Sequence, residues 1–158
     1  MAAFMKQDLE PLDRRILALL QENAALSQSE IAERVGSSPA SCWRRIKALE
    51  AAGVLGPTVR LVDAEKVGCG VTVICNVRVR SHAREVRGAF EDFVRARPEI
   101  IVAHSMSGDW DYLLQIVAAD VADYERFLMR VLLEHPSVGG ASSHFALSTT
   151  KYTTALPV

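Results

Sequence analysis

Apolar residues near the start of the chain recur with the period of an amphipathic helix. Between residues 12 and 20 they are four, three and one positions apart, at Leu12, Ile16, Leu19 and Leu20. At 100° per residue these positions share one helical face. The pattern therefore predicts a helix that begins near residue 12 and packs this face against neighbouring helices.

Capping signals predict two further short helices. The segment S-Q-S-E that begins at Ser27 is a capping box, in which the serine hydroxyl and the Glu30 carboxylate each bind an unpaired backbone N–H. Gly36 is the expected C-terminal cap, and a third helix begins with Ser38 as its cap and Pro39 in its first turn. So tight a turn between two helices predicts a helix-turn-helix unit, whose second helix enters the major groove of DNA.

The third predicted helix has an apolar face and a basic outer side. Cys42, Ile46 and Leu49 share the core face. The candidate DNA contacts outside that face are Ser41, Arg44, Arg45 and Lys47. A small residue near the helix start suits an approach to bases, and the cations suit phosphates. A solvated helix face is the simpler alternative, but the capping box, the tight turn and the one-sided charge together favour DNA binding.

After residue 53 the pattern changes from helical to extended. The β-rich segment 58–62 predicts a wing or linker strand. Beyond it the alternation predicts strands and helices in the order β-α-β-β-α-β, at 71–79, 83–97, 100–106, 111–117, 120–135 and 138–147. That order is typical of a ferredoxin-like domain. The expected fold class is α+β, with a winged helix-turn-helix domain at 1–62 followed by a ferredoxin-like βαββαβ domain at 63–158.

The central strands of this predicted sheet are apolar on both faces. Leu113 and Val117 alternate with Leu114 and Ile116. Two helices cover only one face of a four-stranded sheet, so the other face needs a further covering layer. The pattern predicts a dimer that associates sheet against sheet.

A distinctive turn, Ser107-Gly108-Asp109-Trp110-Asp111, joins the two central strands. Gly108 permits a backbone conformation that exposes N–H groups to a carboxylate, and either aspartate can accept hydrogen bonds from an ammonium group. Together these groups match the two ends of a free α-amino acid. An ordinary hairpin turn is the alternative interpretation.

Composition narrows the class of protein. The 158 residues carry a net charge of −1, so DNA binding has to come from a local basic patch, doubled by dimerisation. Three cysteines without metal-type spacing indicate neither a disulfide framework nor a zinc site, and no metal or cofactor is expected. Because no leader peptide or membrane-length apolar segment is visible, we expect a cytoplasmic protein without membrane contact.

Four segments in order resemble the Lrp/AsnC family, the leucine-responsive or feast/famine transcription regulators. They are LDRRILALLQENA, SSPASCWRRIKALEAAGVL, SGDWDYLL and the terminal KYTTALP, and the resemblance extends over nearly the whole chain. It implies a helix-turn-helix domain, a ferredoxin-like ligand-sensing domain, and dimers that assemble into tetramers or octamers. The implied partners are double-stranded operator DNA and a free amino acid, bound between neighbouring dimers near SGDWDYLL.

The resemblance also implies site residues, position by position. On the DNA side, Ser38, Pro39 and Arg45 occupy positions of the family pattern. The implied effector-binding residues are Met106, Ser107, Gly108, Asp109, Asp111, Tyr112, Val121 and Ser143. Ala141 stands where relatives often have a threonine, so the sequence does not name the effector.

Two other functions fit parts of the sequence. Some relatives of the family are haem-pathway decarboxylases that use histidines, and this chain contains His82, His104, His135 and His144. Isolated histidines are more often structural than catalytic, and the basic helix argues for DNA binding, so no enzymatic activity is expected. The other alternative is an oligomerising sensor that no longer binds DNA.

Overall fold

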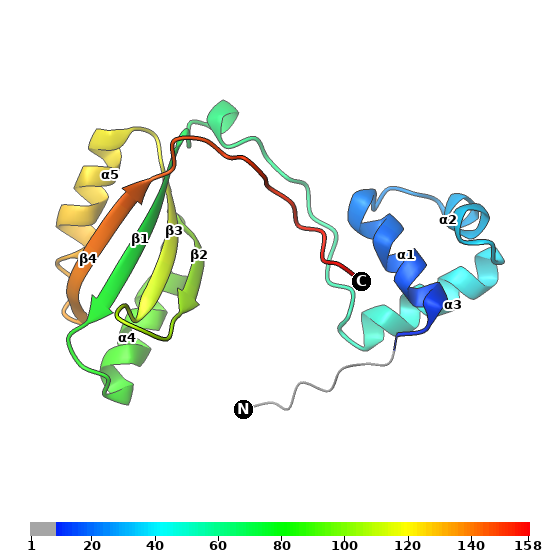
Figure 1. Ribbon diagram of the computed structural model, residues 1–158, viewed down its shortest axis with the longest axis horizontal. Coiled ribbons are helices and arrows are strands. Elements are labelled where there is room, and N and C mark those ends of the chain that lie inside the picture. The colour runs from blue at the N-terminus through cyan, green and yellow to red at the C-terminus, as the bar shows by residue number, and fades with distance from the viewer. Residues whose placement is uncertain (1–8) are drawn as a thin grey trace. The chain divides into compact units, whose positions relative to one another are not determined.

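The computed structural model describes residues 9–158, which form two compact units (Figure 1). One unit ends at Arg60 and also contains Lys151–Val158, and the other is Leu61–Thr150. The boundary between the two units lies close to the expected division at residue 62. The units differ from the expected domains chiefly at the C-terminus, because Lys151–Val158 groups with the N-terminal unit. Residues 1–8, which the expected first domain includes, lie outside the described residues.

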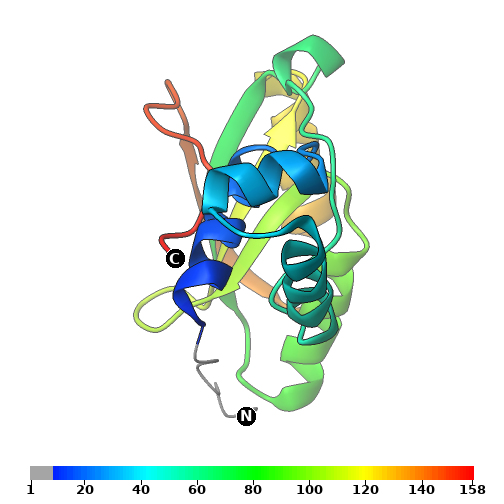
Figure 2. The ribbon, with the colours of Figure 1, turned by 90° about the vertical axis from the view of Figure 1, so that its right-hand side faces the viewer.

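The N-terminal unit consists of α1 (Pro11–Glu22), α2 (Gln28–Val35) and α3 (Pro39–Ala51), which pack against one another (Figure 2). The predicted caps are confirmed. The Ser27 N–H donates to the Glu30 carboxylate at 2.8 Å, and the Glu30 N–H donates to the Ser27 hydroxyl. Gly36 ends α2 with a φ of 65°, and the Ser38 hydroxyl accepts from the Ser41 N–H at 3.2 Å.

The core of this unit comes from the predicted apolar faces. Its buried members are Ile16, Ile31, Ala32, Val35, Cys42 and Ile46. Leu12, Leu19 and Leu20 pack against this cluster from α1. The hydrophobic periodicity therefore identified the packed faces of α1 and α3.

The C-terminal tail is hydrogen-bonded to α1 through one amide side chain. The Leu156 N–H donates to Gln21 Oε1 at 2.6 Å, and Gln21 Nε2 donates to the Leu156 carbonyl at 3.1 Å. A side-chain amide thus pairs with the backbone as a neighbouring strand would. This pairing explains why the tail belongs to the N-terminal unit.

The prediction of a strand at residues 58–62 is wrong for the single chain. This segment has no regular secondary structure, and Val59 and Val62 are exposed. High β propensity favours extended backbone, but a strand also requires a neighbour that pairs with its N–H and C=O groups. Within residues 9–158 the segment has no such neighbour.

The second unit is a four-stranded antiparallel sheet with two helices. The elements are β1 (Val71–Val79), α4 (Arg84–Arg95), β2 (Ile100–Ser105), β3 (Tyr112–Ala118), α5 (Val121–Phe127) and β4 (Val138–Phe145). The strand order is β2-β3-β1-β4, so the predicted ferredoxin-like βαββαβ arrangement is confirmed. Short turns complete the unit at Glu65–Val67, which is 3-10, and at Leu128–Leu132, which continues α5 as a π turn.

The sheet has one covered and one open face. Val73, Cys75 and Val77 of β1 and Leu114 and Ile116 of β3 are fully buried in the core that α4 and α5 complete. The alternate residues of the same strands, among them Ile74, Leu113 and Val117, are only partly buried. No helix of this unit covers that second face, as the sequence pattern predicted.

His135 makes the stability of the second unit depend on pH. Its ring centroid lies 4.5 Å from that of Phe93, and burial, followed by the positive charge of Arg97, lowers the pKa of His135 below 6.5. In the window from pH 6.5 down to that lower pKa, the unfolded chain binds more protons than the native one, so stability falls as pH falls. We expect Tm to fall between pH 7.5 and pH 5.5, and to fall less in His135→Gln. His144→Gln is the control, since His144 is exposed on β4; equal pH dependence in wild type and His135→Gln would contradict this prediction.

Candidate functional site

Two of the candidate DNA contacts on α3, Arg44 and Lys47, are exposed to solvent. Arg44 is exposed and, among residues 9–158, has no ion-pair partner. Lys47 is also exposed and pairs with Glu50 of its own helix, with 2.7 Å between Nζ and the carboxylate. Ser41 lies in the first turn of α3, where its backbone N–H is capped by Ser38. A phosphate contact by Lys47 exchanges one exposed partner for another, which costs little.

Arg45 is partly exposed and forms ion pairs with Glu10 and Asp13 at the start of α1. Its Nε donates to Asp13 at 2.7 Å, and a terminal nitrogen also reaches Glu10 at 2.9 Å. The hydrogen bond to Asp13, and then the one to Glu10, raise the pKa of Arg45 far above its ordinary value. Asp13 is 6% exposed, so this pair ties α3 to the start of α1. Arg45 therefore has ion-pair partners within the helix-turn-helix unit, whereas Arg44 has none among residues 9–158; the sequence predicted a phosphate contact for both.

The loop from Met106 to Asp111 closes the β2–β3 hairpin. The Met106 N–H donates to the Asp111 carbonyl at 2.8 Å, and Gly108 adopts a φ of 114°. The backbone N–H groups of the four residues from Ser107 to Trp110 have no acceptor among residues 9–158. Such a run of unpaired N–H groups is what a carboxylate requires from a binding loop.

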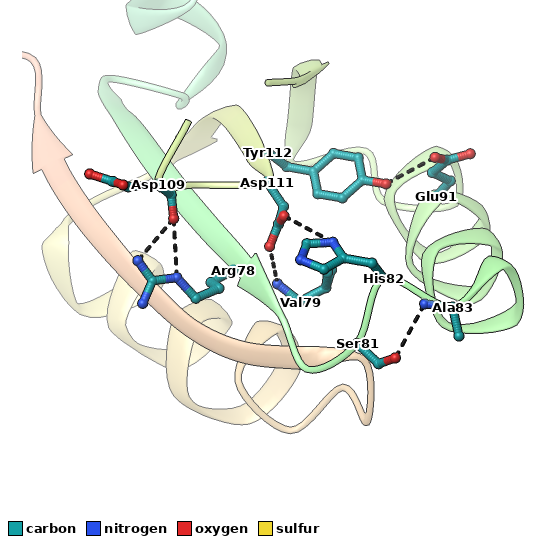
Figure 3. Close-up of polar contacts among 9 residues, drawn as sticks. All are labelled: Arg78, Val79, Ser81, His82, Ala83, Glu91, Asp109, Asp111 and Tyr112. Carbon is teal, nitrogen blue, oxygen red and sulfur yellow. Dashed lines mark hydrogen bonds and ion pairs between the residues drawn. The ribbon is translucent and has the colours of Figure 1, made fainter. Parts of the chain in front are cut away.

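The two aspartates of the loop have different surroundings (Figure 3). One Asp111 oxygen accepts from the Val79 N–H at 2.8 Å, and the other lies 3.4 Å from His82 Nδ1. The Asp109 carboxylate is exposed, points away from this cluster and, among residues 9–158, has no partner. The sequence left both aspartates open as partners for an ammonium group, and this geometry favours Asp109.

Sequence reasoning missed Arg78, which contacts the loop from the end of β1. Its Nε and Nη2 donate to the Asp109 carbonyl at 3.1 and 2.9 Å, and its guanidinium carbon lies 4.9 Å from the centroid of the Trp110 ring. The signal was hidden because 31 positions separate Arg78 from Asp109. Only the antiparallel pairing of β1 with β3, which places Val77 opposite Tyr112, brings them together.

Tyr112 lies on the helix side of the sheet. Its ring centroid is 4.8 Å from that of Phe90, and its hydroxyl donates to Glu91 at 2.9 Å. Burial, followed by Glu91, raises the pKa of Tyr112 to about 12. The side chain also lines a cavity of about 260 Å³ between α4 and β2. The structure therefore does not bring the Tyr112 side chain to the loop.

Val121 and Ser143 are also separated from the loop within one chain. β3 leads from the loop to Ala118, and its seven residues span about 20 Å before Val121 opens α5. Ser143 pairs with Cys75 in the sheet, and its hydroxyl is hydrogen-bonded to the Tyr124 hydroxyl at 2.5 Å. A single chain therefore presents the loop at one end of β3 and Val121 at the other.

The histidines do not form one site. His104 lies on β2 and His144 on β4, at opposite edges of the sheet, while His82 contacts Asp111 and His135 packs on Phe93. Residues 9–158 contain no cluster of three or more His, Cys, Asp or Glu side chains suited to a metal ion. In the same range, no helix combines the length and apolar composition needed to cross a bilayer.

Comparison with known families decides the identity of the chain. The family described as the Lrp/AsnC ligand binding domain matches residues 72–156, and the winged helix-turn-helix DNA-binding family matches residues 9–55. The chain belongs to the Lrp/AsnC family. Together, the two matches show a DNA-binding transcriptional regulator that carries a ligand-binding domain.

Other regulatory proteins are similar to this chain over almost their full length. The chain is 37% identical to the DNA-binding transcriptional activator DecR of Escherichia coli strain K12 over 150 residues, 95% of this chain and 99% of DecR. It is 36% identical to the glutamate uptake regulatory protein of Zymomonas mobilis over 154 residues, 98% of this chain and 93% of that protein.

Solved structures of transcriptional regulators share the fold. The regulator NMB0573 of Neisseria meningitidis, in complex with L-Met, is 38% identical with a TM-score of 0.90, covering 94% of this chain and 96% of that one. An AsnC family regulator from Agrobacterium tumefaciens is 41% identical with a TM-score of 0.89, covering 94% and 97%. These comparisons confirm the family and the α+β fold that the sequence indicated.

Proposed function

We propose that this Lrp/AsnC regulator binds double-stranded operator DNA through α3 and a free amino acid through the loop at Met106–Asp111. The run of unpaired N–H groups around Gly108 carries the effector half of the proposal, because it offers a carboxylate several donors at once. The exposed cations of α3 carry the DNA half. We infer a regulatory rather than catalytic role, since the four histidines do not converge on one site. We propose that the protein acts in the cytoplasm, because its proposed partner is operator DNA.

On the DNA side we assign separate tasks to the α3 residues. Arg44 and Lys47 contact phosphates, and Ser41, with Ser38 and Pro39 at the helix start, approaches the bases. Arg45 holds α3 against α1 through Asp13, so that the exposed side chains keep a fixed orientation. This division replaces the expected phosphate contact of Arg45 with a positioning role.

We expect the double variant Arg44→Ala, Lys47→Ala to bind all DNA sequences more weakly. Each lost phosphate contact should reduce the slope of log K against log salt by about one unit. Fluorescence anisotropy with operator DNA between 50 and 200 mM salt, concentrations at which such contacts are sensitive, measures both quantities. The matched control is Arg95→Ala, Arg126→Ala, which removes two ion-paired exposed arginines of the second unit. Unchanged affinity of the double variant across this salt range would contradict the assignment.

On the effector side the loop supplies only part of a pocket. The loop N–H groups bind the carboxylate, Asp109 accepts from the ammonium group, and Met106 contacts the side chain of the ligand. Val121 lies about 20 Å away along its own chain, so in this proposal it comes from a neighbouring subunit. An apolar residue on that side favours an apolar amino acid. The L-Met complex of the Neisseria meningitidis relative makes L-methionine the first candidate.

A pocket completed by a neighbour couples the ligand to assembly. The open sheet face forms the dimer, and dimers associate further into tetramers or octamers around the loops. A ligand that binds only the completed pocket stabilises the larger assembly by its differential affinity for the two states. Calorimetry with the twenty standard amino acids tests the ligand, and light scattering with and without it tests the coupling. If none binds at millimolar concentration, the effector half of the proposal is rejected.

A further inference from the structure

We infer that Arg78 is a positioning residue of the effector site, which holds the loop so that its N–H groups stay available to the carboxylate of the ligand. The inference rests on the proposed amino-acid binding. Arg78 lies outside the loop, one residue before the end of β1. Figure 3 shows its guanidinium against the Asp109 carbonyl, on the side of the loop away from His82.

The first step is geometric. Arg78 uses two nitrogens on one oxygen, the Asp109 carbonyl, at 3.1 and 2.9 Å. In a trans peptide the C=O and the following N–H point in opposite directions. With the Asp109 carbonyl held toward Arg78, the Trp110 N–H is therefore directed away from it. The contact therefore holds the peptide plane between Asp109 and Trp110 in one orientation.

Arg78 also contacts the ring of Trp110. The guanidinium carbon of Arg78 lies 4.9 Å from the ring centroid, a cation–π distance. Arg78 thus holds two consecutive residues of the loop, one through its backbone and one through its side chain. The loop is anchored at its far end by Asp111, whose N–H donates to the Val77 carbonyl at 3.0 Å and whose carboxylate accepts from Val79. Within the loop from Met106 to Asp111 only Gly108, directly before the first of these anchored residues, has a positive φ.

Arg78 also changes the electrostatics of the loop. The side chains near the loop include the exposed Asp109 carboxylate and the Asp111 carboxylate, which repel an incoming anion. Arg78 carries a permanent positive charge in contact with the loop, and this charge offsets that repulsion. A lysine would keep the charge but has neither a planar fork for one carbonyl nor a flat face for the indole. The inference therefore predicts different behaviour of Arg78→Ala and Arg78→Lys.

The experiment compares the affinities of L-methionine and L-methioninamide for the full-length protein at pH 7 by calorimetry. If another standard amino acid binds more strongly than L-methionine, that amino acid and its amide are compared instead. We expect wild type to prefer the acid by on the order of 100-fold, since the amide lacks the carboxylate that the N–H groups bind. In Arg78→Ala the affinity for the acid should fall by roughly 30-fold, and the preference should fall below about tenfold. Arg78→Lys should lose roughly tenfold in affinity.

Two controls separate positioning from general support of the fold. Arg80→Ala removes an equally exposed cation two residues further along, and should leave affinity and preference unchanged. Tm of Arg78→Ala should stay close to that of wild type, because the Arg78 side chain is exposed.

The outcomes are distinguishable from failure of the proposed function. If wild type binds the acid and Arg78→Ala keeps the same preference for acid over amide, the inference is overturned while amino-acid binding stands. Equal weakening of acid and amide with a lowered Tm would also overturn it, since that indicates only structural support. If wild type binds no standard amino acid, the proposed effector function is rejected and this inference with it.

Discussion

We expect Gly108→Val to abolish amino-acid binding and to leave DNA binding largely unchanged. Gly108 has a φ of 114°, a conformation that β-branched residues essentially do not adopt. Forcing a residue into such a region costs about 1–3 kcal/mol, more than an exposed loop with few contacts can hold. Within residues 9–158, and apart from Gly108 and its two chain neighbours, no atom lies within 4 Å of a Cβ built at Gly108, so the effect comes from a changed loop backbone rather than from a clash. The array of N–H groups is then lost.

The matched control for this variant is Gly88→Ala in α4. Among the described residues, a Cβ at Gly88 also meets no atom within 4 Å beyond its chain neighbours and the backbone of its own helix, and the φ of Gly88 is not positive. Alanine is a better helix former than glycine by about 1 kcal/mol, so this variant should bind the amino acid normally and unfold at a higher temperature. Calorimetry with the tightest-binding amino acid and anisotropy with operator DNA give the two readouts. Retained amino-acid binding in Gly108→Val would place the pocket elsewhere.

We expect Leu113→Asp to dissociate the protein into monomers or to unfold it. Leu113 is half-buried on the open face of the central strand β3, next to Asn76 of β1 and His104 of β2. In the proposed dimer a second sheet covers this face and removes it from water. An unpaired charge buried there costs several kcal/mol, which is a large part of the stability of a small domain. Light scattering of the full-length protein at micromolar concentration measures the outcome.

Leu113→Ala separates charge from lost packing. It removes the same side chain without a charge, so it should weaken the association but keep a dimer at high protein concentration. The comparison also covers a variant that fails to fold, because the alanine variant stays available for measurement. A folded Leu113→Asp protein with the same mass in solution as wild type would contradict the sheet-to-sheet dimer.

The sequence alone determined the elements of the fold, because the responsible interactions are local. The helix caps are local in this sense. The hydrogen bonds of the caps at Ser27, Gly36 and Ser38 join residues no more than three or four positions apart. The spacing of apolar residues along the helices and strands is also a local property. It indicated the open sheet face and the order βαββαβ. The resemblance of four segments was enough to place the chain in its family.

Tertiary structure decided how the polar side chains of the site are used. Arg45 was expected to meet phosphate, but Asp13, 32 positions away, holds it. The sequence did not distinguish Asp109 from Asp111, whereas in the structure Val79 and His82 contact Asp111. Arg78 and Tyr112 likewise took their roles from Asp109 and Glu91, which are 31 and 21 positions distant. A charged or polar group binds whichever partner the packed backbone brings within about 3 Å, and periodicity along the chain does not record that distance.

The segment at residues 58–62 shows the same division from the other side. Its β-rich composition determined an extended preference, yet a strand needs a partner, and residues 9–158 of one chain provide none there. Val121 and the loop at Gly108 were assigned to one pocket by resemblance, whereas the length of β3 separates them within a chain. Sequence determines which residues suit a strand or a ligand. Which residues meet is decided by the register of the sheet and, in our proposal, by the neighbouring subunit, because non-local pairing depends on the packing of the whole fold.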